Sequence, residues 1–250
     1  MTVNKIGYLL MFLLLLGQQA HAQPAESRQI RSGVALLPLT AEVAIHTSFK
    51  NFQNAAIPAN GLVINTQDGL VLVDATWDNY LAKNLLKETD QAFGGKVRYV
   101  LVTSAHEDRI GGLAFWQRQG AKVICHRITA LELVARGFAA PEIVLAGDSV
   151  LTLGQVRLEV CFPGAGHTPD NLAVWLPEAQ ILFGGGLVRS ATTRGPGDTA
   201  DADLIGWKAA LEILHQRYLQ ARIVVPGIGP FGGADLLKHS HNIVVRAINK

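Results

Sequence analysis

Residues 98–112 have the sequence RYVLVTSAHEDRIGG, and the prediction for the whole chain starts from this segment. Its first part, Arg98 to Thr103, is apolar and rich in β-branched residues, which predicts a buried strand. His106 and Asp108 follow in the loop that leaves the strand. Such loops carry functional groups on a rigid support, and an imidazole beside a carboxylate suits a zinc ion. Taken alone, the segment favours an acidic helix cap beside an incidental histidine.

A second histidine follows another predicted strand, in the sequence FPGAGHTPDN of residues 162–171. Gly164 and Gly166 allow a tight turn that aims His167 back over the strand end. A lone histidine in a glycine-rich turn is a weak signal. Two such loops, each at the end of a strand, predict one shared site.

Strand and helix signals continue in both directions from these loops and fall into two halves. We therefore predict a single α/β domain, an αββα sandwich of two facing mixed sheets with helices on both outer faces. The predicted strands span residues 43–49, 61–65, 69–74, 98–103, 122–125, 149–153, 155–162, 172–176, 181–183 and 222–225, and the predicted helices span 79–93, 110–119, 129–136, 203–219 and 235–248.

The first 22 residues have the pattern of a secretory signal peptide. Lys5 precedes the apolar run Ile6–Leu16, and Ala20-His21-Ala22 provides a small-x-small cleavage pattern. Cleavage after Ala22 would leave residues 23–250 as one domain, exported to the periplasm. A membrane anchor is the alternative, but the run is short for a span.

The amino-acid composition of the chain excludes several classes of protein. The chain has 250 residues, of which 49% are hydrophobic and 17% charged, with a formal net charge of +2. These values argue against disorder, coiled coils and a nucleic-acid partner. The two cysteines, Cys125 and Cys161, each end a predicted strand. Two buried thiols are favoured over a disulfide, although export permits one.

The order of these motifs resembles a known family. Asn60-Gly61-Leu62-Val63, Gly166-His167-Thr168-Pro169-Asp170-Asn171, Leu182-Phe183-Gly184-Gly185 and Val224-Val225-Pro226-Gly227 occur in this order, together with the His106 motif. The sequence resembles the metallo-β-lactamase superfamily, and within it the exported subclass B1 enzymes. This resemblance implies the αββα fold, a zinc cofactor and hydrolysis of the β-lactam amide bond.

The resemblance also implies six zinc ligands for two ions, and three of these positions are substituted. Ser104 stands in place of a histidine, Gly186 in place of a cysteine and Ile228 in place of a histidine. The matching ligands are His106, Asp108 and His167. We therefore expect one zinc ion, with Asp108 also orienting the nucleophile. The expectation includes a swing of Asp108 toward that ion through the room that Gly186 leaves.

Substrate-binding positions follow from the same resemblance. Arg189 replaces a lysine that meets the substrate carboxylate, and Asp198 replaces an asparagine that helps to hold the substrate carbonyl. Trp77 matches an apolar wall of the groove, as do Phe49 and Phe52 in a neighbouring loop. We expect a monomer acting on a small molecule. Two alternatives stay open: a hydrolase of another ester or lactone, and a catalytically impaired binding protein.

Overall fold

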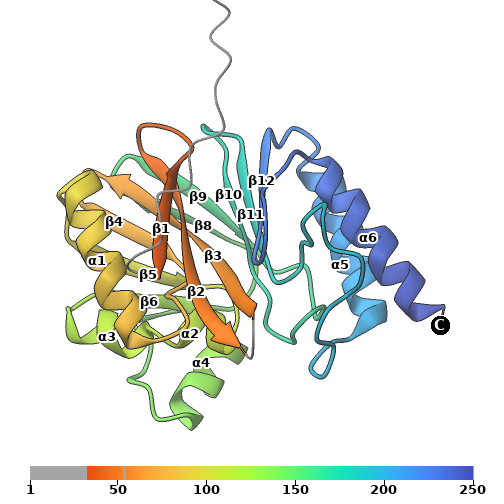
Figure 1. Ribbon diagram of the computed structural model, residues 1–250, viewed down its shortest axis with the longest axis horizontal. Helices are drawn as coiled ribbons and strands as arrows, with labels where there is room; N and C mark the ends of the chain where they lie inside the picture. The colour runs from red at the N-terminus through yellow and green to blue at the C-terminus, as the bar shows by residue number, and fades with distance from the viewer. Residues whose placement is uncertain (1–32, 53–54, 250) are drawn as a thin grey trace, which may run out of the picture.

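The computed structural model describes residues 33–52 and 55–249. The predicted signal peptide, residues 1–22, lies outside this part of the chain. None of the helices in the described ranges has the length and apolar character needed to cross a membrane. Two β-sheets face each other, with helices packed on the outside (Figure 1).

The first sheet has seven strands in sequential order. Its first four strands pair antiparallel, and β4 to β7 pair parallel. The strands are β1 (Val34–Pro38), β2 (Val43–Phe52), β3 (Ala55–Thr66), β4 (Gly69–Val73), β5 (Val97–Val102), β6 (Lys122–His126) and β7 (Ile143–Leu145). The predicted hairpin at Asp68-Gly69 is confirmed, since Thr66 pairs with Gly69 between β3 and β4.

The second sheet has five strands in the order β12-β11-β10-β9-β8. Its strands are β8 (Ser149–Leu153), β9 (Val156–Cys161), β10 (Ala173–Leu176), β11 (Ile181–Gly185) and β12 (Ile223–Pro226). All neighbours pair antiparallel except β11 and β12, which are parallel. A chain that returns from β11 to a parallel neighbour needs a crossover, and a helix supplies it.

Six helices complete the described part of the domain. They are α1 (Asn79–Phe93), α2 (Glu107–Ile110), α3 (Leu113–Arg118), α4 (Arg127–Ala135), α5 (Leu204–Arg217) and α6 (Asp235–Ile248). Apolar side chains of α1, α3 and α4 pack on the seven-stranded sheet, and those of α5 and α6 pack on the other. A third apolar cluster fills the space between the sheets. The predicted αββα sandwich is confirmed.

Local chemistry explains where the helices begin and end. The carboxylate of Asp78 accepts a hydrogen bond from the Leu81 N–H at the start of α1, and Gly94 ends this helix with φ 68°. The predicted helix 110–119 is divided at Gly111 and Gly112. A Cβ at Gly111 would lie 1.9 Å from the Trp77 carbonyl oxygen, so only glycine fits at this position.

The two cysteines lie in different layers. Cys125 belongs to the cluster under α1 and α3, whereas Cys161 belongs to the cluster under α5 and α6. Both are free and buried, as predicted. Burial raises the pKa of Cys125 to about 12 and that of Cys161 to about 11, so both are unreactive neutral thiols at physiological pH.

Candidate metal and substrate site

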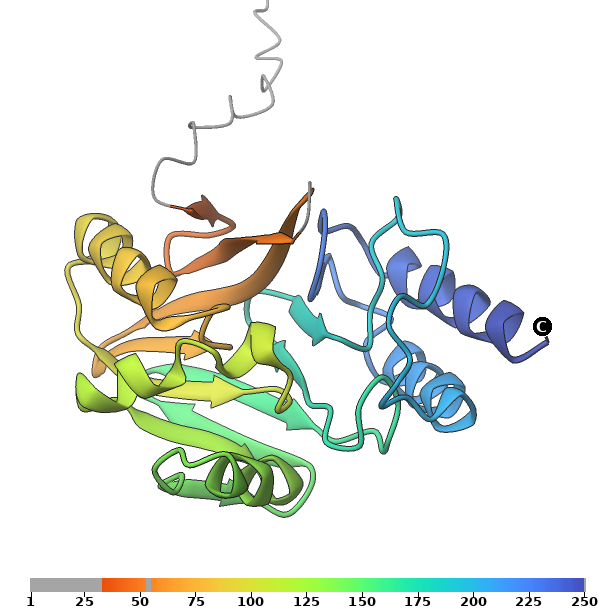
Figure 2. The same ribbon diagram turned by 60° about the horizontal axis from the view of Figure 1, so that its bottom comes forward.

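The site lies where loops from both sheets meet. His106 follows β5 in the first sheet, and His167 follows β9 in the second. The long loop after β11 contacts both of these loops: the Asp203 N–H donates to the Gly166 carbonyl at 2.9 Å, and Asp201 Oδ2 lies 3.0 Å from His106 Nε2. In Figure 2 the loop after β9 and the long loop after β11 run beside α5. The two histidine loops predicted to form one site are therefore neighbours.

His106 and His167 make direct ring contact. Their ring centroids lie 5.1 Å apart and the planes are nearly perpendicular, at 85°. The His167 ring also packs against Trp207 of α5 at 5.0 Å. Burial lowers the pKa of His167 to about 2, with further lowering by the positive charge of Arg189. His167 is therefore neutral at physiological pH, which is the form that binds metals.

The carboxylate of Asp108 forms an ion pair with the next residue in the sequence, Arg109. One oxygen of its carboxylate lies 2.9 Å from Arg109 Nη2. Arg109 is 2% exposed, and its Nη1 donates to the carbonyl oxygen of Asn60 at 2.8 Å and lies 3.4 Å from Asp74. The guanidinium thus ties the His106 loop to β3 and to the end of β4.

Asp74 supports this loop from the other side. Its Oδ1 accepts hydrogen bonds from the Thr103 N–H at 2.8 Å and from the Thr103 hydroxyl at 2.9 Å. Burial raises the pKa of Asp74 to about 7, even though Arg109 and Thr103 act to lower it. The backbone of Asp74 has φ 64°, a conformation that aspartate tolerates better than most side chains.

Asp170 fastens the two histidine loops to each other. It lies three residues beyond His167, yet its Oδ2 accepts from the Ala105 N–H at 2.8 Å and from the Thr129 hydroxyl at 2.7 Å. The side chain is 4% exposed. Because Ala105 directly precedes His106, this carboxylate fixes the spacing between the two histidines.

Asp201 is a site residue that the sequence prediction missed. Its Oδ2 lies 3.0 Å from His106 Nε2, although the two residues are 95 positions apart. Asp203, two residues further on, caps the following helix by accepting from the Gly206 N–H. A carboxylate on one ring nitrogen of a histidine leaves the other nitrogen for a ligand, as in many metal sites.

Arg189 lies inside the site, beside His167. Its Nη2 is 3.2 Å from His167 Nδ1, and its guanidinium lies 4.8 Å from the centroid of the Trp207 ring. The residue is 7% exposed, and its backbone N–H donates to the Ser240 hydroxyl at 2.8 Å. Burial lowers the pKa of Arg189 to about 10, so it stays charged at neutral pH.

The expected room beside Gly186 does not exist. A Cβ built on Gly186 would lie 2.6 Å from Cδ2 of His167, so the imidazole fills the space that a larger side chain would take. Asp108 is also held by Arg109. The expectation that Gly186 gives Asp108 room to swing is therefore wrong, because a close-packed interior leaves no such gap.

The contact between Gly186 and His167 makes a prediction for stability. Gly186→Ala should lower the free energy of unfolding by about 1–3 kcal/mol, since a stiff aromatic ring has to move. Urea denaturation followed by tryptophan fluorescence measures it. Gly195→Ala is the matched control, because nothing lies within 4 Å of a Cβ there. Equal stability of the two variants would show that His167 moves freely.

The other predicted positions differ in how far they are exposed to solvent. Ser104 is 6% exposed and Ile228 is 36% exposed. Asp198 is exposed and accepts from the Ala200 N–H at 3.0 Å. Trp77 packs in part against the cluster under α1, and Lys50 Nζ lies 5.3 Å from its ring centroid.

Phe49 and Phe52, expected in a loop, belong to β2, and the Phe52 side chain is 58% exposed. They lie on the extended arm that β2 and β3 form. The arm thus offers at least one large apolar side chain to solvent.

The residues offer donors for one zinc ion at most. His106 and His167 are neighbouring imidazoles, and Asp201 leaves one nitrogen of His106 for a ligand. Gly186 and Ile228, at two of the positions for a second ion, offer no donor side chain. Within residues 33–52 and 55–249, no three histidine, cysteine or acidic side chains stand grouped around a common point. Asp108 and His167 are instead held by arginines.

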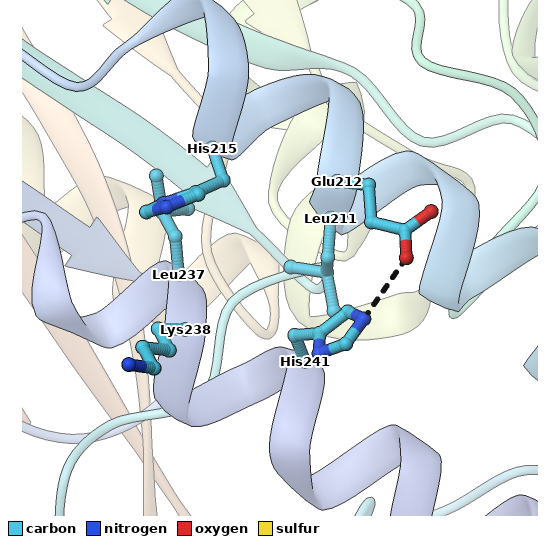
Figure 3. Close-up of a pocket in the computed structure, with 6 residues that line it drawn as sticks. All are labelled: Leu211, Glu212, His215, Leu237, Lys238 and His241. Carbon is cyan, nitrogen blue, oxygen red and sulfur yellow. Dashed lines mark hydrogen bonds and ion pairs between the residues drawn. The ribbon is translucent and has the colours of Figure 1, made fainter.

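A separate hollow lies between α5 and α6. It has a volume of about 280 Å³ and is lined by Leu211, Glu212, His215, Leu237, Lys238 and His241 (Figure 3). The Glu212 carboxylate accepts from Lys208 at 2.6 Å and lies 3.2 Å from His241 Nε2, so its charge is already balanced. No residue of the histidine site lines this hollow.

An αββα sandwich that carries histidines and a carboxylate in the loops at one edge of its sheets is the architecture of a class of metal-binding proteins. Residues 56–228 match the sequence profile of the metallo-beta-lactamase superfamily. A metallo-beta-lactamase type 2 from Bacillus sp. (strain 170) is 39% identical over 211 residues, which cover 84% of this chain and 82% of that protein. The chain belongs to the metallo-β-lactamase superfamily, a family that implies zinc as its metal.

Solved structures agree with this assignment. A metallo-beta-lactamase from Pontibacter korlensis superposes with a TM-score of 0.81 at 37% identity, over 85% of this chain and 99% of that one. A metallo-beta-lactamase from Pseudomonas aeruginosa, solved in its mono-zinc form, gives a TM-score of 0.79 at 32% identity, over 86% of this chain and 96% of that one.

Proposed function

We propose that this chain hydrolyses the amide bond of β-lactams with one zinc ion held by His106, His167 and Asp108. The observation that carries the proposal is the contact of His106 with His167, combined with the carboxylate of Asp201 on His106 Nε2. Support comes from relatives, which are metallo-beta-lactamases, and from the mono-zinc form of one of them.

Zinc, when bound, lowers the pKa of a coordinated water to about 7 and so supplies a nucleophile at neutral pH. The chain's own residues position the reaction. Asp201 accepts the Nε2 proton of His106, which leaves Nδ1 as the ligand nitrogen. Asp108, with one oxygen 2.9 Å from Arg109 Nη2, would offer its other oxygen to the ion and would orient the attacking water.

Arg189 would bind the substrate carboxylate. Its planar guanidinium can hold a carboxylate through two parallel hydrogen bonds. The carboxylate of Asp198 accepts a hydrogen bond from the Ala200 N–H, so it would not take the place of an amide donor to the substrate carbonyl. Trp77 and the exposed Phe52 would line the apolar side of the bound molecule.

Hydrolysis assays with zinc supplied in excess test the proposed function. We expect ring opening of at least one penicillin, cephalosporin or carbapenem, seen as a change in ultraviolet absorbance, and no activity after chelation. Failure with every class would reject β-lactam hydrolysis. Activity on esters or lactones alone would favour another hydrolase, and binding without turnover would favour a binding protein.

A substitution of Asp201 tests whether this residue supports zinc binding and not only the stability of the fold. Asp201→Ala should weaken zinc affinity by about 10–100-fold, the usual effect of removing the hydrogen-bond partner of a metal-bound histidine. Asp198→Ala is the matched control, because Asp198 lies on the same loop but bonds only to Ala200 among the partners described. Competition with a chromophoric chelator measures both affinities. Equal affinities would contradict the proposed role of Asp201.

We also propose that the protein is exported to the periplasm as a monomer after cleavage at Ala22. The first 22 residues support the export, and a periplasmic location would place the enzyme where it could confer antibiotic resistance. Mass spectrometry of the N-terminus in a periplasmic extract tests the cleavage. A full-length cytoplasmic product would reject it.

A further inference from the structure

The position of Arg189 goes beyond binding a substrate. Its guanidinium packs on Trp207 at 4.8 Å and contacts His167 Nδ1 at 3.2 Å, while its Nε has no hydrogen-bond partner among the described residues. Only 7% of the residue is exposed. The buried guanidinium of Arg189 thus lies inside a site where members of the family bind a zinc ion.

The contact between Arg189 and His167 fixes the proton on the imidazole. A guanidinium can only donate hydrogen bonds, so Nδ1 of His167 must accept. Neutral His167 therefore carries its proton on Nε2.

This arrangement opposes zinc at either nitrogen of His167. An ion at Nδ1 needs the lone pair that already accepts from Arg189. An ion at Nε2 needs that nitrogen deprotonated, and the proton of the neutral ring then moves to Nδ1, where two donors face each other. Both routes break the contact between Arg189 and His167.

The surrounding charge strengthens the same effect. Arg109 is a second buried guanidinium, 2% exposed, and the Asp108 carboxylate lies 2.9 Å from its Nη2. Gly186 and Ile228 bring no thiolate to offset this charge and no imidazole to bind an ion. A second ion would meet two guanidinium groups and one carboxylate.

We propose that Arg189 competes with zinc for His167: its guanidinium occupies the lone pair of Nδ1 and keeps the proton on Nε2, so neither nitrogen is free for an ion while this contact lasts. The inference rests on the proposed one-zinc site. Arg189 must turn away from His167 before zinc binds there, and zinc and the resting position of Arg189 exclude each other.

Zinc titration of the metal-free protein tests this competition. Arg189→Met keeps a side chain of similar length without the charge or the donor. We expect the variant to bind zinc at least about tenfold more tightly in competition with a chromophoric chelator, because the lost bond involves a charged group. Arg194→Met is the matched control, since Arg194 is exposed on the same loop. Equal or weaker binding by Arg189→Met would overturn the inference.

A second measurement needs no variant. The ¹⁵N chemical shifts of His167 in the metal-free wild-type chain report its tautomer. We expect a protonated Nε2 and an accepting Nδ1, and the opposite tautomer would overturn the inference even if Arg189→Met does not fold.

Neither measurement uses a β-lactam. Zinc binding without hydrolysis would therefore contradict the proposed function alone. If neither the wild type nor Arg189→Met binds zinc, the inference falls together with the proposed metal site.

Discussion

Arg109→Met should lower the free energy of unfolding by about 3–5 kcal/mol at pH 8, the usual effect of removing one partner from a buried ion pair. The guanidinium is 2% exposed and contacts Asp108 at 2.9 Å and Asp74 at 3.4 Å. Methionine has a similar length but no charge. The substitution would leave two buried carboxylates without their common cation, and the Asn60 carbonyl without its donor.

The loss should depend on pH in a defined direction. The pKa of Asp74 in the folded protein is about 7 with Arg109 lowering it, against 3.8 as the unperturbed value. Without Arg109 the folded pKa rises further. At any pH between the unperturbed pKa and the folded pKa of Asp74, the folded state binds a proton that the unfolded state does not. The free energy of unfolding therefore increases as the pH falls through this range. The difference between variant and wild type should therefore shrink from pH 8 to pH 6.

Urea denaturation at both pH values measures this effect. Arg157→Met is the matched control, because Arg157 pairs with Glu159 at 2.9 Å on the surface, where its side chain is 49% exposed. Exposed pairs contribute at most about 1 kcal/mol. A loss below 1 kcal/mol for Arg109→Met, or one that grows on acidification, would contradict the role assigned to the buried network.

The fold could be predicted because its signals are local. The β3–β4 hairpin follows from Asp68-Gly69 between two apolar runs, and α1 follows from helical spacing that ends at Gly94. The strands β1 and β7 were not predicted. They are edge strands of five and three residues. Such short strands depend on pairing with a neighbour rather than on their own sequence.

The candidate site could be predicted only in part. His106 and His167 were expected to meet, because each follows a strand and glycines shape their loops. Asp201 was missed, and Arg189 was expected only from the family resemblance, as a substrate-binding group. Their contacts with His106 and His167 depend on how the irregular loop 186–203 folds back. Gly186 shows the same limit: a small residue in a sequence suggests space, whereas the packed structure fills that space with a ring.

His167→Ala should have the largest effect on function. It removes one of only two imidazoles in the proposed zinc site, and a site of three ligands has none to spare. Losing a hydrogen-bond partner of a ligand already weakens metal binding about 10–100-fold, so loss of the ligand itself should exceed about 100-fold. Hydrolysis at limiting zinc should fall by the same factor.

The companion variants decide whether His106 and His167 act together. His106→Ala should match His167→Ala, and the double variant should be no worse than either, because ligands of one ion act as a unit and their effects do not add. His241→Ala is the control for loss of a histidine, since His241 lies on α6 outside the site. Zinc content by mass spectrometry and the rate of β-lactam ring opening are the two readouts. Unchanged zinc content in both single variants would show that the two histidines hold no metal. Additive losses would place them at separate sites, which their ring contact at 5.1 Å argues against.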